Sequence, residues 1–368
     1  MIGMIQTIAV EGYRSIRDLT VELAPLTVVT GANGSGKSSL YRALRLLAES
    51  ARNGAVAAIA REGGLRSTRW AGPPGKSGPV SIRLGFAGDG DGYAVDLGLP
   101  VPSGSIFGND PEIKREVLFS GPLLRPSGVL ADRAGPLISV RNGRRMEPAL
   151  EAVAPYDSML GQYADGPLIR MRERIRGWRF YDHLRTDAEA PARRATIGTR
   201  TPILGHDGGD LAAALQTIRE VGVHGELSGA IDAAFPGSRI GISDDEEGRL
   251  WLTLTQPGLR RPLGTTELSD GTLRYLLLVA ALLTPRPPEL LVLNEPETSL
   301  HPDLLAPLAG LITTAAKRCQ ILVVTHAPAL ADALGDDAHR IELIKDEGET
   351  RVAGLGRFEA PAWQWPKR

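Results

Sequence analysis

The segment from Gly31 to Ser38 constrains the fold of this chain more than any other, because it reads GANGSGKS and fits the pattern G-x-x-x-x-G-K-[ST]. An apolar run at residues 26–30 precedes it and predicts a short buried strand. A helix is predicted after it from apolar residues three or four positions apart, namely Leu40, Tyr41, Leu44 and Leu47. Glycines at such a junction let backbone N–H groups turn toward an anion at a helix N-terminus. The sequence therefore predicts a phosphate-binding loop (P-loop) in an α/β fold.

Residue types within this loop suit a nucleoside triphosphate. Lys37 is expected to reach the β- and γ-phosphates, and Ser38 is expected to bind Mg²⁺. The neighbouring residues are expected to surround the phosphates with backbone N–H groups. The predicted contacts to ATP and Mg²⁺ are Asn33, Gly34, Ser35, Gly36, Lys37, Ser38 and Ser39. A glycine-rich turn before a surface helix is the alternative, and the motifs that follow weigh against it.

Residues 290–294 form an apolar run that ends in Asn294 and is followed by Glu295. This pattern predicts a buried central strand that delivers polar side chains to its carboxyl end, as the Walker B strand of P-loop ATPases does. Glu295 is then expected to orient or deprotonate the attacking water, and Asn294 to help hold Mg²⁺. Because Asn294 stands where an aspartate is usual, we expect weaker Mg²⁺ binding and slow turnover. An ordinary carboxylate at a strand end is the alternative for Glu295.

A second apolar strand is predicted at residues 321–325, and it ends at His326. Between the two strands, Pro302 suits the first turn of a helix. A histidine at a strand end is often a hydrogen-bonded structural residue. The order of the motifs favours a catalytic role instead, so Glu295, Lys37 and His326 are the predicted catalytic residues.

The segment Glu267 to Thr272 reads ELSDGT and resembles the signature of ABC ATPases, usually written LSGGQ. The motifs also follow one another in the order found in that class. The resemblance implies that Ser269 and Gly271 contact the γ-phosphate held by a second subunit, and hence that ATP binding produces a homodimer. Asp270 and Thr272 depart from the usual glycine and glutamine.

Two further segments narrow the resemblance. Residues 12–15 read GYRS and resemble the aromatic–Arg–Ser start of SMC and RecF-like proteins, which implies that Arg14 contacts the nucleotide. A surface arginine after a first strand is the alternative. The phrases NEPETSLHP and LSDGT resemble the predicted-ATPase group often labelled AAA21. For the Q-loop glutamine of this class, Gln162 is one candidate and Gln216 a weaker one.

The resemblance implies an α/β fold, with a P-loop NTPase core of the ABC-type ATPase head assembled from residues 1–50 and 263–368. Residues 51–262 are then an inserted antiparallel β lobe and a helical lobe. Short alternating segments at 80–86, 93–99 and 116–120 predict the antiparallel strands. A helix is predicted over residues 165–185, with mobile segments at 54–79 and 186–209. Heptads sustained over any length are absent, which excludes the long arms of SMC proteins.

The charges balance, with 42 Lys and Arg residues against 43 Asp and Glu residues, so any contact with nucleic acid must be local. An arginine-rich stretch offers one, because its aromatic residues could stack on bases. Its arginines are 170, 172, 174, 176, 179 and 185, around Trp178, Phe180 and Tyr181. The favoured alternative is a solvated face paired with acids such as Glu173 and Asp182. DNA and an effector protein are therefore both candidate partners.

Cys319 is the single cysteine, so the chain is expected to hold neither an internal disulfide nor a cysteine zinc site. The longest apolar stretches, such as Leu276 to Leu283, are far shorter than the roughly 20 residues that span a bilayer. Residues 1–11 lack the features of a signal peptide. A cytoplasmic protein without a membrane partner is the expectation.

Together these observations predict an ATP-gated dimeric switch that hydrolyses ATP slowly in DNA maintenance or defence. A non-hydrolysing ATP sensor that regulates a partner effector protein is the alternative, because Asn294 could leave binding intact without turnover. A transporter ATPase would need membrane partners, and the large insertion shows no signal for them. A nuclease of the overcoming-lysogenisation (OLD) type would need a further metal-binding domain, for which too few residues follow His326.

Overall fold

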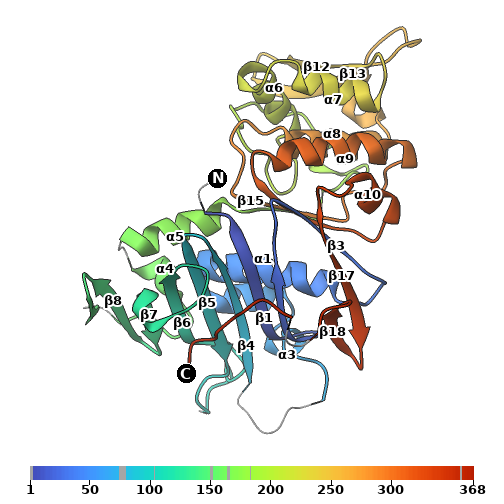
Figure 1. Ribbon diagram of the computed structural model, residues 1–368. Coiled ribbons are helices and arrows are strands. Elements are labelled where there is room, and N and C mark those ends of the chain that lie inside the picture. The colour runs from blue at the N-terminus through green and yellow to red at the C-terminus, as the bar shows by residue number, and fades with distance from the viewer. Residues whose placement is uncertain are drawn as a thin grey trace. The chain divides into compact units, whose positions relative to one another are not determined.

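The computed structural model describes residues 3–73, 80–102, 104–149, 152–163, 166–182, 184–356 and 359–368. The chain forms two compact units (Figure 1). The first unit comprises residues 1–178 and 339–368, and the second comprises residues 179–338. The predicted core (1–50 and 263–368) and insert (51–262) have other boundaries than these two units. That predicted division stays a prediction.

An eight-stranded antiparallel sheet dominates the first unit. In sheet order its strands are β2 (Ile16–Glu22), β1 (Ile5–Tyr13), β4 (Ser81–Gly88), β5 (Asp91–Gly98), β6 (Glu112–Ser120), β7 (Val129–Ala134), β8 (Leu137–Asn142) and β9 (Arg145–Pro148). The three predicted antiparallel segments are β4, β5 and β6, as expected from their alternating sequences. The sheet also includes the N-terminal strands β1 and β2.

The P-loop lies between β3 (Leu26–Thr30) and α1 (Lys37–Asn53). Strand β3 pairs in parallel with β17 (His339–Asp346), which pairs in antiparallel with β18 (Glu349–Val352). The predicted strand and helix are both confirmed, and the predicted apolar face of α1 is buried. The first unit also contains α2 (Ala55–Arg61), α3 (Leu65–Thr68), η1 (Pro126–Gly128), α4 (Met159–Gln162) and α5 (Gly166–Gly177).

Helix α5 is shorter than predicted. Leu168, Met171 and Ile175 form its buried stripe, as expected. The helix ends at Gly177, however, and β10 (Arg179–Tyr181) follows it. Residues 179–181 pair in parallel with β15, because an Arg-Phe-Tyr sequence with two aromatic side chains suits a half-buried strand better than a helix. The prediction of a helix to residue 185 is therefore wrong after Gly177.

A buried ion pair joins β6 to β7 in the first unit. Glu116 and Arg133 are fully buried and lie opposite each other across the two strands, 3.3 Å apart. Glu116 also accepts hydrogen bonds from Tyr93 Oη at 2.5 Å and Ser158 Oγ at 2.5 Å. The Arg133 guanidinium donates to the carbonyl of Ala154 at 2.8 Å. Because both charges have several partners, this pair is stable without water.

A parallel sheet of β10, β15 (Leu290–Asn294) and β16 (Gln320–Val324) lies in the second unit. The four residues Leu290–Leu293 are buried, as a central strand requires. Asn294 lies opposite Val324, so β15 and β16 end at the same edge. The helices near this sheet are α8 (Asp270–Leu282), η4 (Pro302–Leu304), α9 (Leu305–Ala316) and α10 (Pro328–Ala333). The predicted strands at 290–294 and 321–325 and the helix start at Pro302 are confirmed.

The rest of the second unit combines helices with a small antiparallel sheet. Its elements are η2 (Pro191–Arg193), β11 (Thr196–Ile197), α6 (Leu211–Val221), α7 (Glu226–Ala234), β12 (Arg239–Asp244), β13 (Arg249–Thr255), β14 (Leu263–Gly264) and η3 (Thr265–Glu267). Cys319 is buried, and burial raises the pKa of its thiol to about 11. Within the described residues, no helix combines the length and the apolar character that crossing a bilayer requires.

Candidate functional site

The P-loop holds its own lysine in place. Lys37 begins α1 and is only 6 % exposed. Its Nζ donates to the carbonyls of Gly31 at 2.6 Å and Ala32 at 3.0 Å. These contacts keep the ammonium group at the loop, where a cation would offset phosphate charge. Asn33, Gly34 and Ser38 are exposed and accessible to a ligand.

Glycine is required at Gly36 by both its backbone and its neighbours. It has a φ of 110°, and a Cβ added there would lie 2.0 Å from Thr350 Oγ1. The Thr350 hydroxyl in turn contacts Ser15 Oγ at 2.8 Å, and Ser15 Oγ contacts Ser39 Oγ at 3.1 Å. The loop therefore packs closely on β18 and on the turn between β1 and β2.

Ser35 provides a test of whether the loop fits a phosphate. Its side chain is buried, and its Oγ has no hydrogen-bond partner among the described residues. A buried hydroxyl normally has a partner, and a phosphate oxygen would supply the acceptor that this one lacks. The loop therefore fits a bound phosphate chain.

Arg14 lies in the turn after β1 with a φ of 50°. Its guanidinium pairs with the Glu62 carboxylate and donates to Tyr13 Oη at 3.1 Å. Burial raises the pKa of Tyr13, so its phenol stays neutral and can accept this bond. Arg14 is thus fixed next to Ser15, which contacts the P-loop helix through Ser39. Contact between Arg14 and nucleotide stays a prediction.

Asn294 ends β15 with its amide oxygen buried and without a hydrogen-bond partner among the described residues. An amide oxygen can accept a hydrogen bond from water bound to Mg²⁺ or coordinate the ion itself. The orphaned oxygen therefore fits the predicted role of Asn294 near a metal ion.

Glu295 and His326 lie together at the aligned ends of β15 and β16. His326 Nδ1 is 3.5 Å from Glu295 Oε1 and 3.4 Å from Glu297 Oε1. Glu297 is buried and accepts hydrogen bonds from Thr325 Oγ1 at 2.5 Å and from the His326 backbone N–H at 3.2 Å. The side chains of Glu295 and His326 are half-exposed, so water can reach them. We call Glu295, Glu297, Thr325 and His326 the carboxylate–histidine cluster.

Sequence reasoning missed Glu297. A second carboxylate two residues after Glu295 is the signal that could have identified it. Glu297 Oε1 accepts the backbone N–H of His326 and lies 3.4 Å from its Nδ1, so this buried carboxylate contacts both the main chain and the ring of His326. Its second oxygen is buried without a hydrogen-bond partner among the described residues, as a functional carboxylate often is.

Glu295 has a strained backbone. Its φ is 48°, which is rare for a residue with a side chain. Its N–H donates to the carbonyl of Val324 at 2.7 Å, so pairing with β16 enforces the conformation. Such strain is common where a side chain must be held in a particular direction.

Arg274 is a second residue that sequence reasoning missed. It lies on α8, buried, and donates to the carbonyls of Leu184 at 2.8 Å and Glu295 at 3.2 Å. Burial lowers the pKa of its guanidinium, and Glu297 and Glu295 act against this change. Arg274 therefore joins the signature helix to the loop that carries Glu295.

The signature segment begins α8. Ser269 is the N-cap, and its Oγ accepts the N–H of Thr272 at 3.1 Å. The hydroxyl of Thr272 contacts Ser269 Oγ at 2.9 Å. A Cβ added at Gly271 would lie 2.6 Å from the carbonyl of Ser299, so only glycine allows this close contact. Thr272 thus has a local structural role in place of the usual glutamine.

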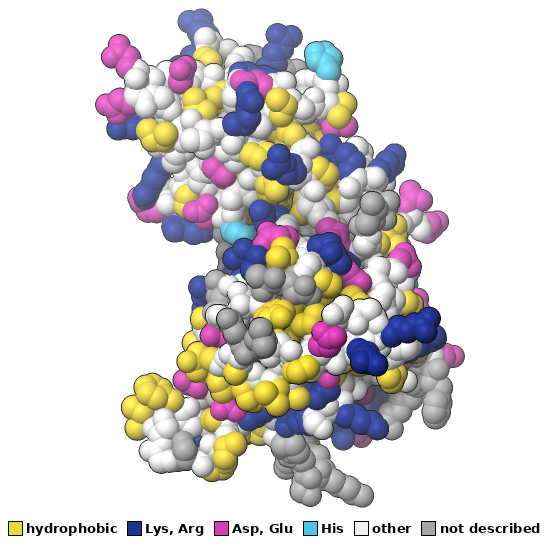
Figure 2. Space-filling view, turned by 90° about the vertical axis from the view of Figure 1, so that its left-hand side faces the viewer, with side chains coloured by type: hydrophobic (Ala, Val, Ile, Leu, Met, Phe, Trp, Pro, Cys, Tyr) yellow, Lys and Arg dark blue, Asp and Glu magenta, His cyan; other side chains and the backbone are white. Residues whose placement is uncertain are grey.

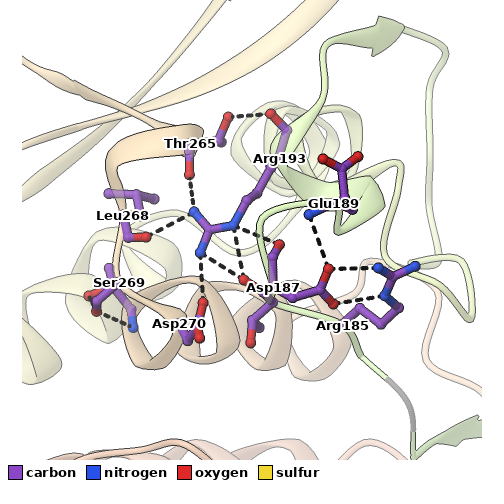
Figure 3. A network of polar contacts seen from close by, with 10 residues as sticks. Arg185, Asp187, Glu189, Arg193, Thr265, Leu268, Ser269 and Asp270 are labelled. Carbon is purple, nitrogen blue, oxygen red and sulfur yellow. Dashed lines mark hydrogen bonds and ion pairs between the residues drawn. The ribbon is translucent and has the colours of Figure 1, made fainter.

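Arg193 holds the start of the signature segment (Figure 3). Its buried guanidinium donates to the carbonyls of Thr265 at 2.6 Å and Leu268 at 2.9 Å. It also pairs with Asp270 at 2.8 Å, which explains the acid at the position of the usual glycine. A further bond to the carbonyl of Thr186 ties residues 186–193, expected to be mobile, to this segment.

Replacing Arg193 with leucine is expected to loosen the signature segment, because two buried carbonyls and Asp270 lose their partner. The amides of residues 272–276, which donate the first hydrogen bonds of α8, should exchange with deuterium at least tenfold faster. Hydrogen exchange measured by mass spectrometry checks this. Arg194 is the matched control, because it is exposed and forms its ion pair with the exposed Glu189, so Arg194→Leu should leave the exchange unchanged.

The glutamine candidates do not gain support. Gln162 faces a cavity with Ser50 and Gly54, near the C-terminal end of α1. Ser50 lies thirteen positions after Lys37 on this helix, which corresponds to a distance of roughly 20 Å. Gln216 is on α6 in the second unit, where it donates to Glu220 at 2.5 Å. The position of Gln162 argues against a Q-loop role.

The structure contradicts a base-stacking role for the aromatic residues of the arginine-rich stretch. Trp178, Phe180 and Tyr181 are buried, so none of them can stack on a base. Arg172 and Arg176 pair with Glu173, as the alternative predicted. Charges of both signs alternate on the face drawn in Figure 2, where the described residues form no continuous basic surface.

Known proteins resemble this chain over most of its length. It is 24% identical over 373 aligned residues to an OLD nuclease of Thermus scotoductus, covering 95% of this chain and 63% of that protein. The chain therefore spans less than two thirds of that relative.

Solved structures share the fold. An SMC head bound to the C-winged helix domain of ScpA aligns with a TM-score of 0.57 at 15% identity, covering 97% of this chain and 100% of that one. The SMC head of Thermotoga maritima aligns with a TM-score of 0.51 at 15% identity, covering 96% and 99%. The predicted α/β fold of an ABC-type ATPase head is thereby confirmed.

The profile of one family extends from the P-loop strand beyond His326. It matches residues 26–332, which is most of the chain, and its description reads "AAA domain, putative AbiEii toxin, Type IV TA system". This is the AAA21 group that the phrases around Glu295 and Ser269 predicted. The chain therefore belongs to this family of AAA domains.

Proposed function

We propose that this protein hydrolyses ATP with Mg²⁺ and that ATP binding joins two copies of the chain. The carboxylate–histidine cluster carries the proposal. It combines a strained, half-exposed carboxylate with a histidine whose ring also lies 3.4 Å from a second, buried carboxylate. A sheet edge built only for stability does not need this arrangement.

Each residue has a separate task in the proposed reaction. Lys37 and the P-loop amides bind the phosphates, and Ser38 and Asn294 supply oxygen atoms for Mg²⁺. The metal ion would neutralise charge on the phosphates. Glu295 orients the attacking water or accepts its proton, and His326 contacts the γ-phosphate.

The signature segment supports the proposed dimer. Ser269 is exposed, and its hydroxyl caps α8. The helix N-terminus at this position offers backbone N–H groups to an anion. A phosphate held by a second copy of the chain would complete this anion site. Hydrolysis would then remove the group that holds the two copies together. DNA and an effector protein remain candidates for what the dimer acts on.

Glu295→Gln is expected to keep ATP binding, to lose at least 95% of turnover and to accumulate dimers, because only proton acceptance is removed. Phosphate release measures turnover, and light scattering after gel filtration measures the dimer. Glu246→Gln is the matched control, because Glu246 is exposed in the same unit. An unchanged monomer fraction with and without ATP would refute the dimer.

Asn294 favours a second candidate function, that of an ATP sensor with negligible hydrolysis. The metal site lacks the charge that an aspartate would bring. Asn294→Asp is therefore expected to lower the Mg²⁺ concentration for half-maximal activity and to raise turnover two- to tenfold. ATPase rates across a Mg²⁺ titration measure both quantities. If neither changes, Asn294 does not slow the enzyme, and a sensor role loses its support.

A further inference from the structure

A polar cavity of about 240 Å³ lies in the first unit, roughly 20 Å along α1 from the P-loop lysine. The end of α1 contributes Ser50 and Arg52, α4 contributes Gln162, and α5 contributes Arg172 and Arg176. All of these elements belong to the first unit. The cavity is therefore separate from the P-loop and does not depend on how nucleotide binds there.

The described lining of this cavity is basic. It includes three arginines and one acid, Asp157. Arg172 and Arg176 are one helical turn apart on α5, so both guanidinium groups can reach one ligand. Their common partner, Glu173, is 57 % exposed and 3.3 to 3.4 Å away. Ion pairs this exposed are weak, so an incoming anion can replace Glu173.

Ser50 points to a ligand independently of the arginines. It is 2 % exposed, and its Oγ has no hydrogen-bond partner among the described residues. A buried hydroxyl with no partner is rare in a folded protein. An anion in the cavity would supply the acceptor that Ser50 lacks.

The walls of the cavity are held rigidly. Arg52 donates to the carbonyls of Ile175, Arg176 and Trp178, which fixes the end of α5 against α1. Ser158 caps α4 and donates to the buried carboxylate of Glu116 at 2.5 Å. Binding therefore costs little ordering of the backbone.

We propose that this cavity binds a phosphate group. Arginine is suited to phosphate because its planar guanidinium donates two parallel hydrogen bonds to two oxygens. The nearby aromatic residue Trp178 is buried, so recognition rests on phosphate and not on a base. The volume suits a phosphate with a small substituent, because it lies below the range of about 300–1,000 Å³ typical for larger ligands. Free phosphate and the 5′-phosphate of a nucleic-acid strand share this chemistry.

The test uses the full chain with Lys37→Ala, so that the P-loop does not contribute. Calorimetric titration with inorganic phosphate should show binding that Arg172→Gln with Arg176→Gln weakens at least tenfold. Ser50→Ala should weaken it about tenfold, because a hydrogen bond from the hydroxyl to a charged phosphate is lost. Arg170→Gln is the matched control, because Arg170 is exposed on the same helix and does not line the cavity.

A second measurement identifies the source of the phosphate. A short oligothymidylate with a 5′-phosphate is compared with the same strand carrying a 5′-hydroxyl. Tighter binding of the phosphorylated strand, lost in the double variant, assigns the cavity to strand ends. Binding of inorganic phosphate without that preference assigns it to free phosphate. The proposal is overturned if the double variant binds phosphate as the control does, or if inorganic phosphate does not bind.

Discussion

Replacing Lys37 with alanine is expected to lower ATP affinity at least a hundredfold. The ammonium group is buried at the P-loop, where it would make charge-assisted contacts to two phosphates. Each such contact contributes about 1.5–3 kcal/mol, and 1.4 kcal/mol changes an equilibrium constant tenfold. Titration with a fluorescent ATP analogue measures the affinity.

Two controls separate this effect from misfolding. Lys317→Ala removes an exposed lysine after α9, so it should leave affinity unchanged. Thermal unfolding shows whether Lys37→Ala folds, since the carbonyls of Gly31 and Ala32 lose their donor. A folded Lys37→Ala protein with near-normal ATP affinity would contradict the P-loop assignment.

Replacing Arg133 with leucine is expected to reduce the stability of the first unit by about 3–5 kcal/mol. The change leaves the Glu116 carboxylate buried without its cation, and an unpaired buried charge is costly. It also removes the donor to the carbonyl of Ala154. Urea unfolding followed by tryptophan fluorescence measures the loss.

Arg115→Leu is the matched control, because Arg115 lies beside Glu116 on β6 and pairs with Asp132 in a partly exposed position. It should cost about 1 kcal/mol or less. The double variant Glu116→Leu, Arg133→Leu should lose less stability than the sum of the losses caused by the two single changes. The recovery should be incomplete, because Tyr93 and Ser158 still lose their acceptor. Equal losses for Arg133→Leu and Arg115→Leu would show that burial of the pair is unimportant.

The sequence predicted the elements whose signal is local. The predictions of a strand at residues 26–30 and of the apolar face of α1 were correct, because a strand, a glycine loop and a helix follow one another without interruption. The end of β15 at Asn294 was predicted correctly because the apolar run of residues 290–293 stops there, which is also a local signal. The prediction for residues 179–181 was wrong because their strand depends on pairing with β15, more than a hundred residues later in the chain.

The site residues that were missed depend on contacts between distant segments. Arg193 reaches Asp270 across 77 positions, and Arg274 reaches Leu184 across 90. In the sequence neither arginine belongs to a motif. The hydrogen bonds that give them a role exist only after the chain has folded, so composition and spacing could not identify them.

Arg274 links the first turns of α8 to the residue that follows β15, because its guanidinium donates to the carbonyl of Glu295. If α8 moved alone, its buried guanidinium would lose the carbonyl of Glu295, at a cost of about 1–3 kcal/mol. A displacement of the signature end of α8 would therefore carry the backbone of Glu295 with it. In the proposed dimer, docking of the second copy at Ser269 would be transmitted along one helix to the residue that activates water. Dimer formation would then control when each chain hydrolyses ATP, and no other segment would have to move.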